Sequence, residues 1–242
     1  MRAKTIAQIS TGLLAWLAYL FFGSLIIYNS LGYFGPLNAM VFVEEKAPVS
    51  TEPLWRAALV LHVAGGLLCL AAATLQFFRR LTRRFPALHR ALGNLYAFAV
   101  MCLLCPSGMY LALFANGGFP GQLGFLVLGA LTYWTTSRGV SEMAAGRPRP
   151  HARWMIRSFG LITTAITFRL YHVGLGYADW WSPATSYVAA LWLSIAGNAL
   201  AAECCARLIP LAATSSLKTN AAPPHHHEPN LHAPLLSRAG PR

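Results

Sequence analysis

Apolar residues fill six stretches of the chain, and polar residues gather between them. Each stretch has roughly the 20 residues that a helix rising about 1.5 Å per residue needs to cross about 30 Å of hydrocarbon. None alternates as a strand would, and a helix satisfies its own backbone hydrogen bonds in lipid. The pattern predicts an all-α integral membrane protein, a six-transmembrane-helix bundle with spans at 12–33, 55–78, 92–114, 122–143, 154–177 and 184–204.

The composition agrees with a membrane protein. The 242 residues are 56% hydrophobic and only 11% charged, whereas soluble domains are about 25% charged. From Ala212 the chain is rich in Ser, Thr, Pro, Asn and His. We therefore expect a transmembrane domain over 1–211 and a disordered cytoplasmic tail over 212–242. The net charge of +12 is typical of loops beside a membrane, so nucleic acid is not an expected partner.

Positive charges predict the orientation of the bundle. Arginine and lysine concentrate before the first stretch, after the second, after the fourth and after the sixth. Helices that alternate in direction bring these segments to one side, which the positive-inside rule makes cytoplasmic. The opposite loops carry only Lys46 and Arg56 as basic residues. We therefore expect a multi-pass protein of the inner membrane with both termini in the cytoplasm.

Ionisable side chains inside the stretches are the first candidates for function, because a charge near the bilayer centre costs at least about 2.5 kcal/mol. On the second stretch His62, several small residues and Gln76 recur at helical spacing and form one face. On the fifth stretch Arg169 and His172 lie one turn apart. The alternative is plain helix packing, in which a buried histidine only joins two helices.

The histidines fall at two depths. His62 and His172 each lie seven residues from the outer boundary, about 10 Å deep, and His89 and His151 each begin a helix at the inner boundary. Axial ligation of b-type haem requires a histidine on each side of the iron. We therefore expect haem b between His62 and His172, with Arg169 beside a propionate. His89 and His151 form a second candidate pair, and Gln76 completes the candidate cofactor-binding residues.

The same polar residues permit other functions. Histidines in a bundle can relay protons or bind quinone, as in a quinone-linked electron-transfer protein with a redox partner. They can also line the polar cavity of a small-molecule transporter or sensor, and transport can be coupled to protons. A third alternative is a structural membrane partner, in which these residues only join helices. The sequence lacks a phosphate-binding loop, HExxH and GxSxG, which removes the usual basis for nucleotide and hydrolase chemistry. Whether the protein is an enzyme stays open.

Arginines cluster at the inner ends of the third and fifth stretches. Helix N-termini expose unpaired N–H groups, and such groups beside arginines favour an anion. The default occupant is the headgroup of an anionic lipid in the surrounding bilayer, and at the inner end this explanation, or plain topology charge, is favoured over haem between His89 and His151. The expected anion-binding residues are Arg84, Arg90, Arg153 and Arg157.

Two segments carry a resemblance to a known family. They read PALHRALGNLY at 86–96 and HARWMIRSF at 151–159. They resemble a group of bacterial multi-helix membrane proteins known only as a domain of unknown function, over roughly residues 55–175. Asn94 stands where such proteins usually have arginine, which implies weaker binding of any anion there. The layout is also similar to cytochrome b561-like and ferric-reductase-like electron carriers, and this likeness implies haem by analogy of fold alone.

Overall fold

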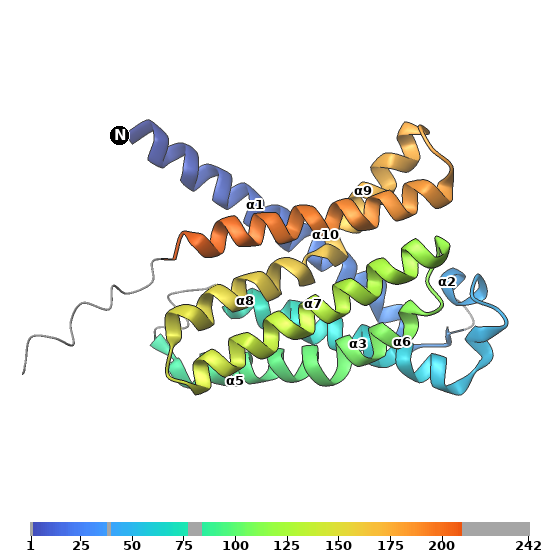
Figure 1. Ribbon diagram of the computed structural model, residues 1–242, viewed down its shortest axis with the longest axis horizontal. Helices are drawn as coiled ribbons and strands as arrows, with labels where there is room; N and C mark the ends of the chain where they lie inside the picture. The colour runs from blue at the N-terminus through green and yellow to red at the C-terminus, as the bar shows by residue number, and fades with distance from the viewer. Residues whose placement is uncertain (1, 38–39, 77–83, 210–242) are drawn as a thin grey trace, which may run out of the picture. The chain divides into compact units, whose positions relative to one another are not determined.

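The computed structural model describes residues 2–37, 40–76 and 84–209, and the regular structure in these ranges is entirely helical (Figure 1). The all-α fold class is therefore confirmed. The predicted tail over 212–242 lies outside the described residues, as do Arg79, Arg80 and Arg83. The longer elements are α1 (Arg2–Ser30), α3 (Pro53–Gln76), α5 (Pro86–Phe98), α6 (Cys105–Ala112), α7 (Gly118–Ala144), α8 (Pro148–Ile162), α9 (Thr164–Ala178) and α10 (Pro183–Arg207).

Four helical segments are long and apolar enough to cross a membrane in the described part of the chain. They are Trp16–Phe34, Pro53–Gln76, Pro86–Ala112 and Pro183–Arg207, and they match four of the six predicted spans. The predicted span 122–143 lies within α7, which has 27 residues and carries more polar side chains. The predicted span 154–177 falls on two helices, α8 and α9, of 15 residues each.

Consecutive spans run in opposite directions and bring their ends together at two levels, with α5–η4–α6 and α8–α9 each counted as one span. Gln76 at the end of α3 meets His89 of α5, and His151 of α8 meets Gly139 of α7. We call this level the His89 end. The other level, here the Trp55 end, holds the start of α3, the connection from α6 to α7 and the start of α10 (Figure 1).

A π-helical turn interrupts the third predicted span. This turn, η4 (Ala99–Leu104), joins α5 to α6 and ends just before Pro106. Proline has no N–H to donate to the carbonyl one turn earlier and its ring clashes with that carbonyl, so a regular α-helix does not pass through this position undisturbed. π-helical turns are rare and occur frequently at functional sites. The local widening of the helix faces α3, where the cavity described below begins.

The fifth predicted span breaks at Thr163, so the expectation of one continuous helix was wrong. The ψ angle of Thr163 is −8°, far from the −42° of an α-helix. Its hydroxyl donates to the carbonyl of Gly160 at 2.7 Å, and such back-bonding bends helices. The amide of Asn198 on α10 donates to Thr163, Thr164 and Thr167 at 3.3, 3.2 and 2.9 Å. One side chain therefore fixes both sides of the break.

Small residues let α3 approach η4 closely. A Cβ atom built on Gly65 would lie 2.8 Å from the backbone nitrogen of Leu104. The core there is made of side chains that are almost fully buried: Cys69, Ala72, Ala73, Tyr96, Ala99 and Val100. Much of the small-residue face predicted on the second stretch is thus a packing surface.

Candidate functional site

A cavity of about 880 Å³ opens at the Trp55 end, within the size range of small-molecule sites, about 300–1,000 Å³. Its walls come from the ends of α1 and α8, from α3, η4, α6, α7, α9 and α10, and from the segment between α1 and α3. The predicted residues His62, Arg169 and His172 all line it. The structure therefore brings His62 to the same cavity as Arg169 and His172, which lie more than a hundred positions later in the sequence.

His62 is held in one tautomer by the π-helical turn. Its Nδ1 lies 3.1 Å from the carbonyl oxygen of Leu104. Because a carbonyl only accepts, Nδ1 carries the proton, and Nε2 keeps its lone pair. The ring lies against Gly108, where an added Cβ atom would be 2.8 Å from ring atoms. The turn and the glycine together orient the imidazole.

Aromatic rings position His172 on α9. Its ring stacks on Phe168 with centroids 5.8 Å apart and an interplanar angle of 11°. Tyr187 of α10 meets it edge-on at 5.3 Å. One turn earlier, Arg169 donates from Nη1 to the carbonyl of Ala165 at 2.6 Å. The imidazole and the guanidinium are thus neighbours on the same wall of the cavity.

The fixed charges of the cavity are mostly positive. Lys46 and Arg169 are cationic and Glu45 is anionic, and all three line the cavity. In the described part of the chain no carboxylate pairs with Arg169. Burial lowers the pKa of Lys46, and the neighbouring Glu45 opposes this shift. An acidic ligand would meet two cations here.

Gln76, His89 and His151 lie at the other end of the bundle. Gln76 is 14 residues from His62 on the same helix, about 21 Å along its axis, and donates from Nε2 to the carbonyl of His89 at 2.8 Å. The Nδ1 atom of His151 lies 2.8 Å from the carbonyl of Gly139. His89 and His151 are close enough to interact electrostatically. The second predicted pair is therefore gathered as well, and Gln76 belongs to that end.

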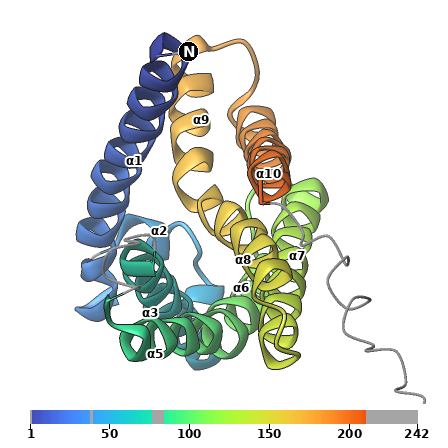
Figure 2. The ribbon, with the colours of Figure 1, turned by 90° about the vertical axis from the view of Figure 1, so that its left-hand side faces the viewer.

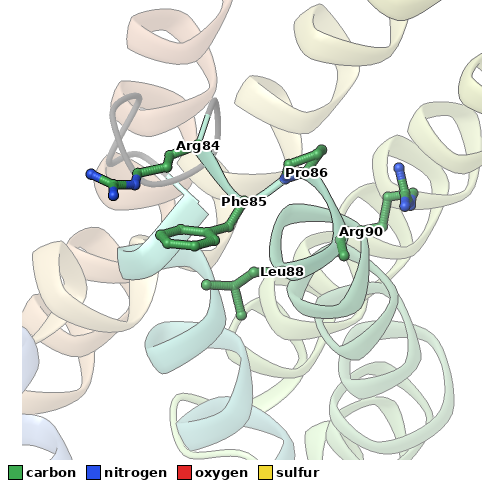
Figure 3. Close-up of a pocket in the computed structure, with 6 residues that line it drawn as sticks. Arg84, Phe85, Pro86, Leu88 and Arg90 are labelled. Carbon is green, nitrogen blue, oxygen red and sulfur yellow. The ribbon is translucent and has the colours of Figure 1, made fainter.

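The four predicted anion-binding arginines separate into two groups. Arg84 and Arg90 border a shallow pocket of about 540 Å³, where their guanidinium groups flank Phe85 and Leu88 (Figure 3). Arg153 donates to the carbonyl of Ile209 at 2.9 Å. Arg157 donates to Glu203 at 2.8 Å. Because Arg157 already has a carboxylate partner, it is less available to an anion, and anion binding by the four arginines stays a prediction.

A buried hydroxyl cluster lies between the two pairs of histidines. The Tyr96 hydroxyl and the Thr136 hydroxyl each lie 2.7 Å from Oγ of Ser158. Thr136 in turn donates to the carbonyl of Thr132 at 2.8 Å, and Thr132 lines the cavity. Hydrogen bonds therefore join α5, α8 and α7 directly beneath the cavity.

Several of these residues were missed in the sequence. Lys46 lies in a loop, and its hydrogen bonds to the connection at 114–116 follow no periodic pattern in the sequence. Glu203 could have been found, because a carboxylate within an apolar stretch predicts a cationic partner. The same holds for Asn198, whose amide must be satisfied when it is buried.

The apolar helices and the enclosed polar side chains define a multi-pass membrane protein. A family model described as "Predicted membrane protein (DUF2306)" matches residues 59–206. The chain belongs to this family, as the two sequence segments had suggested. No curated protein and no solved structure matches the chain. The family covers the helices from α3 to α10, so the cavity lies largely within it.

Proposed function

We propose that the protein crosses a bacterial inner membrane six times and keeps both termini in the cytoplasm. The alternating helices support this topology, because α7 and the α8–α9 pair lie beside the four apolar spans (Figure 2). The His89 end carries Arg84, Arg90, Arg147 and Arg149, which makes it the cytoplasmic end by the positive-inside rule. The cavity then opens toward the outer side.

We infer that the cavity binds b-type haem between His62 and His172. The observation that carries this proposal is the orientation of His62, whose Nδ1–H is donated to a backbone carbonyl while Nε2 is left as a ligand. Metal-binding histidines almost always donate their other N–H in this way. Arg169, one turn from His172, suits a haem propionate. When bound, haem supplies one-electron chemistry.

The second pair strengthens the proposal of electron transfer across the membrane. His151 also donates through Nδ1 to a backbone carbonyl, that of Gly139. Each pair thus has one histidine whose Nδ1 is bonded to a carbonyl and a second histidine on another helix. A quinone or another redox partner would exchange electrons at one of the two ends. The residues proposed to hold the groups are His62 and His172 outside, and His89 and His151 inside.

A proton-coupled carrier of a small organic anion is the second candidate. The observation that favours it is Arg169, whose described contacts include a backbone carbonyl but no carboxylate. A transported anion would pair with the Arg169 guanidinium, and His62 or His172 would carry the proton. The same cavity serves both candidates, so the ligand decides between them.

The visible spectrum of the protein, purified in mild detergent from haem-replete cells, tests the first candidate. We expect a Soret band, a sharp reduced α band and nearly stoichiometric haem. His62→Ala and His172→Ala should remove the outer haem, whereas the matched change His151→Ala should leave it. A colourless protein from such cells contradicts haem binding. Anion uptake into proteoliposomes that is driven by a pH gradient and lost in Arg169→Gln would then support the carrier.

A further inference from the structure

An ordered segment covers the mouth of the cavity. It contains the short helices α2 (Val41–Glu44) and η3 (Val49–Thr51) and leads into α3. Val43 of this segment is buried against Trp55 and Leu59, with partly buried apolar neighbours on α6. Phe42 stacks on Trp55 at 6.2 Å. Its exposed residues Phe42 and Glu45 line the cavity, so the cavity meets solvent beside this segment.

Lys46 joins this segment to the opposite side of the mouth. Its ammonium donates to the carbonyl of Phe114 at 2.7 Å and also to Oδ1 of Asn116. Both acceptors lie in the connection from α6 to α7, about 70 positions away in the sequence, and both residues line the cavity. The ammonium also lies 5.9 Å from the ring of Phe42. The flexible side chain of Lys46 thus connects the segment before α3 to the connection from α6 to α7.

The bonds of Lys46 are of a kind that an anion can replace. A carbonyl and an amide are neutral acceptors, whereas a carboxylate adds the Coulomb attraction of an opposite charge to its hydrogen bond with the ammonium. The lowered pKa of Lys46 agrees with an ammonium that has lost part of its hydration. An acidic solute at the mouth would therefore draw the ammonium away from Phe114 and Asn116.

We propose that Lys46 is a releasable latch on an aqueous entrance, and that organic anions are the solutes that open it. The entrance deepens the proposed ligand-binding role of the cavity and rests on it. Arg169 on the cavity wall provides the next cation along the path, while Glu45 is the single acidic side chain among the lining residues. Cationic solutes are repelled by the Lys46 ammonium and do not draw it away from Phe114 and Asn116, so they stay outside the cavity.

The thiol of Cys105 can report on the access of reagents through the entrance. Cys105 lies on the cavity wall and is 3% exposed. A test protein keeps Cys105 and carries alanine at the other four cysteines, Cys69, Cys102, Cys204 and Cys205. It is reconstituted in nanodiscs and treated with two methanethiosulfonate reagents of similar size, one with a sulfonate and one with a trimethylammonium group. Each rate is divided by the rate of the same reagent with free cysteine.

We expect the sulfonate reagent to modify Cys105 about tenfold faster than the ammonium reagent, since a charge-lined entrance raises the local concentration of counter-ions. Lys46→Met should open the mouth to both reagents and reduce this preference severalfold. Lys46→Arg, the matched control, should retain the preference. Asn116→Ala removes one acceptor and should raise both rates less than Lys46→Met does.

Equal normalised rates in the parent, or rates that Lys46→Met leaves unchanged, would overturn the proposal. Ala112→Cys in a variant without Cys105 gives a second reporter, two turns nearer the mouth, and should react faster than Cys105. No reaction at either position in Lys46→Met would also overturn it. The measurement needs no bound haem, so a colourless protein that passes this test loses the haem proposal alone.

Discussion

The hydroxyl of Tyr96 lies 2.7 Å from Oγ of Ser158, and both side chains are buried. This bond ties α5 to α8. Because Thr136 donates to the carbonyl of Thr132, Ser158 must donate to Thr136 and Tyr96 must donate to Ser158. The three hydroxyl protons therefore point in one direction, from Tyr96 toward the cavity.

Removing the middle hydroxyl of these three hydrogen-bonded side chains should destabilise the protein more than removing the hydroxyl at the end. Ser158→Ala leaves the buried hydroxyl of Tyr96 without its partner, which costs about 1–3 kcal/mol. Tyr96→Phe removes the hydroxyl as well as its bond and should cost less. Unfolding of the purified variants by SDS, followed by circular dichroism, gives the order. A larger loss in Tyr96→Phe would contradict the assigned direction.

Close packing at Gly65 should make this position intolerant of a methyl group. The added Cβ atom of Gly65→Ala would lie 2.8 Å from the backbone of η4, which cannot move aside as a flexible side chain can. We expect a destabilisation of about 1–3 kcal/mol. Gly23→Ala is the matched control, since nothing lies within 4 Å of its added Cβ. Equal unfolding midpoints for the two variants would refute the close contact.

The ion pair between α8 and α10 should matter more than its exposed neighbour. Glu203 binds Arg157, whose side chain is 23% exposed, and Arg207, whose side chain is 76% exposed. Salt bridges at exposed positions contribute little. Arg157 also lies 4.6 Å from the ring of Trp154. We therefore expect Arg157→Ala to lower the thermal midpoint clearly and Arg207→Ala to lower it little. The reverse order would mean that the Arg157 bonds do not hold the two helices.

Stability should rise with pH where Lys46 titrates. Burial lowers the pKa of Lys46 in the folded protein, while the unfolded chain keeps the usual value of about 10.4. Between these two pKa values the unfolded state binds more protons, so the free energy of unfolding increases as pH rises. Lys46→Arg does not titrate in this range and should lack this part of the increase. Parallel pH profiles for wild type and variant would disprove the shift.

The sequence predicted the all-helical class, four of the spans and one relation between distant residues. Apolar length predicts the spans because hydrocarbon thickness is fixed, and equal depth from the boundaries predicted that His62 and His172 would share a level. Depth alone says nothing of which helices face one another. The cavity takes lining residues from both α3 and α9, and their meeting there depends on the packing of the whole bundle.

The periodic pattern of apolar residues could not predict two local features, and the reasons are physical. The break at Thr163 depends on hydrogen bonds from Asn198, 35 positions away, and a helical pattern continues through such a break. Lys46 is attached to residues 68 and 70 positions away. Long-range partners of polar side chains are decided by the fold, and the fold is decided mainly by the apolar residues.

The π-helical turn at Ala99–Leu104 acts as a one-residue insertion in an otherwise regular helix. Each residue of an α-helix advances the chain by about 100° around the axis. Deleting one residue from this turn would restore α-helical phase and rotate everything after it by that angle. Gly108 would leave its place beside the ring of His62, and Cys105 and Ala112 would turn away from the cavity. The angular register of α6 against α3 is therefore set by a single extra residue.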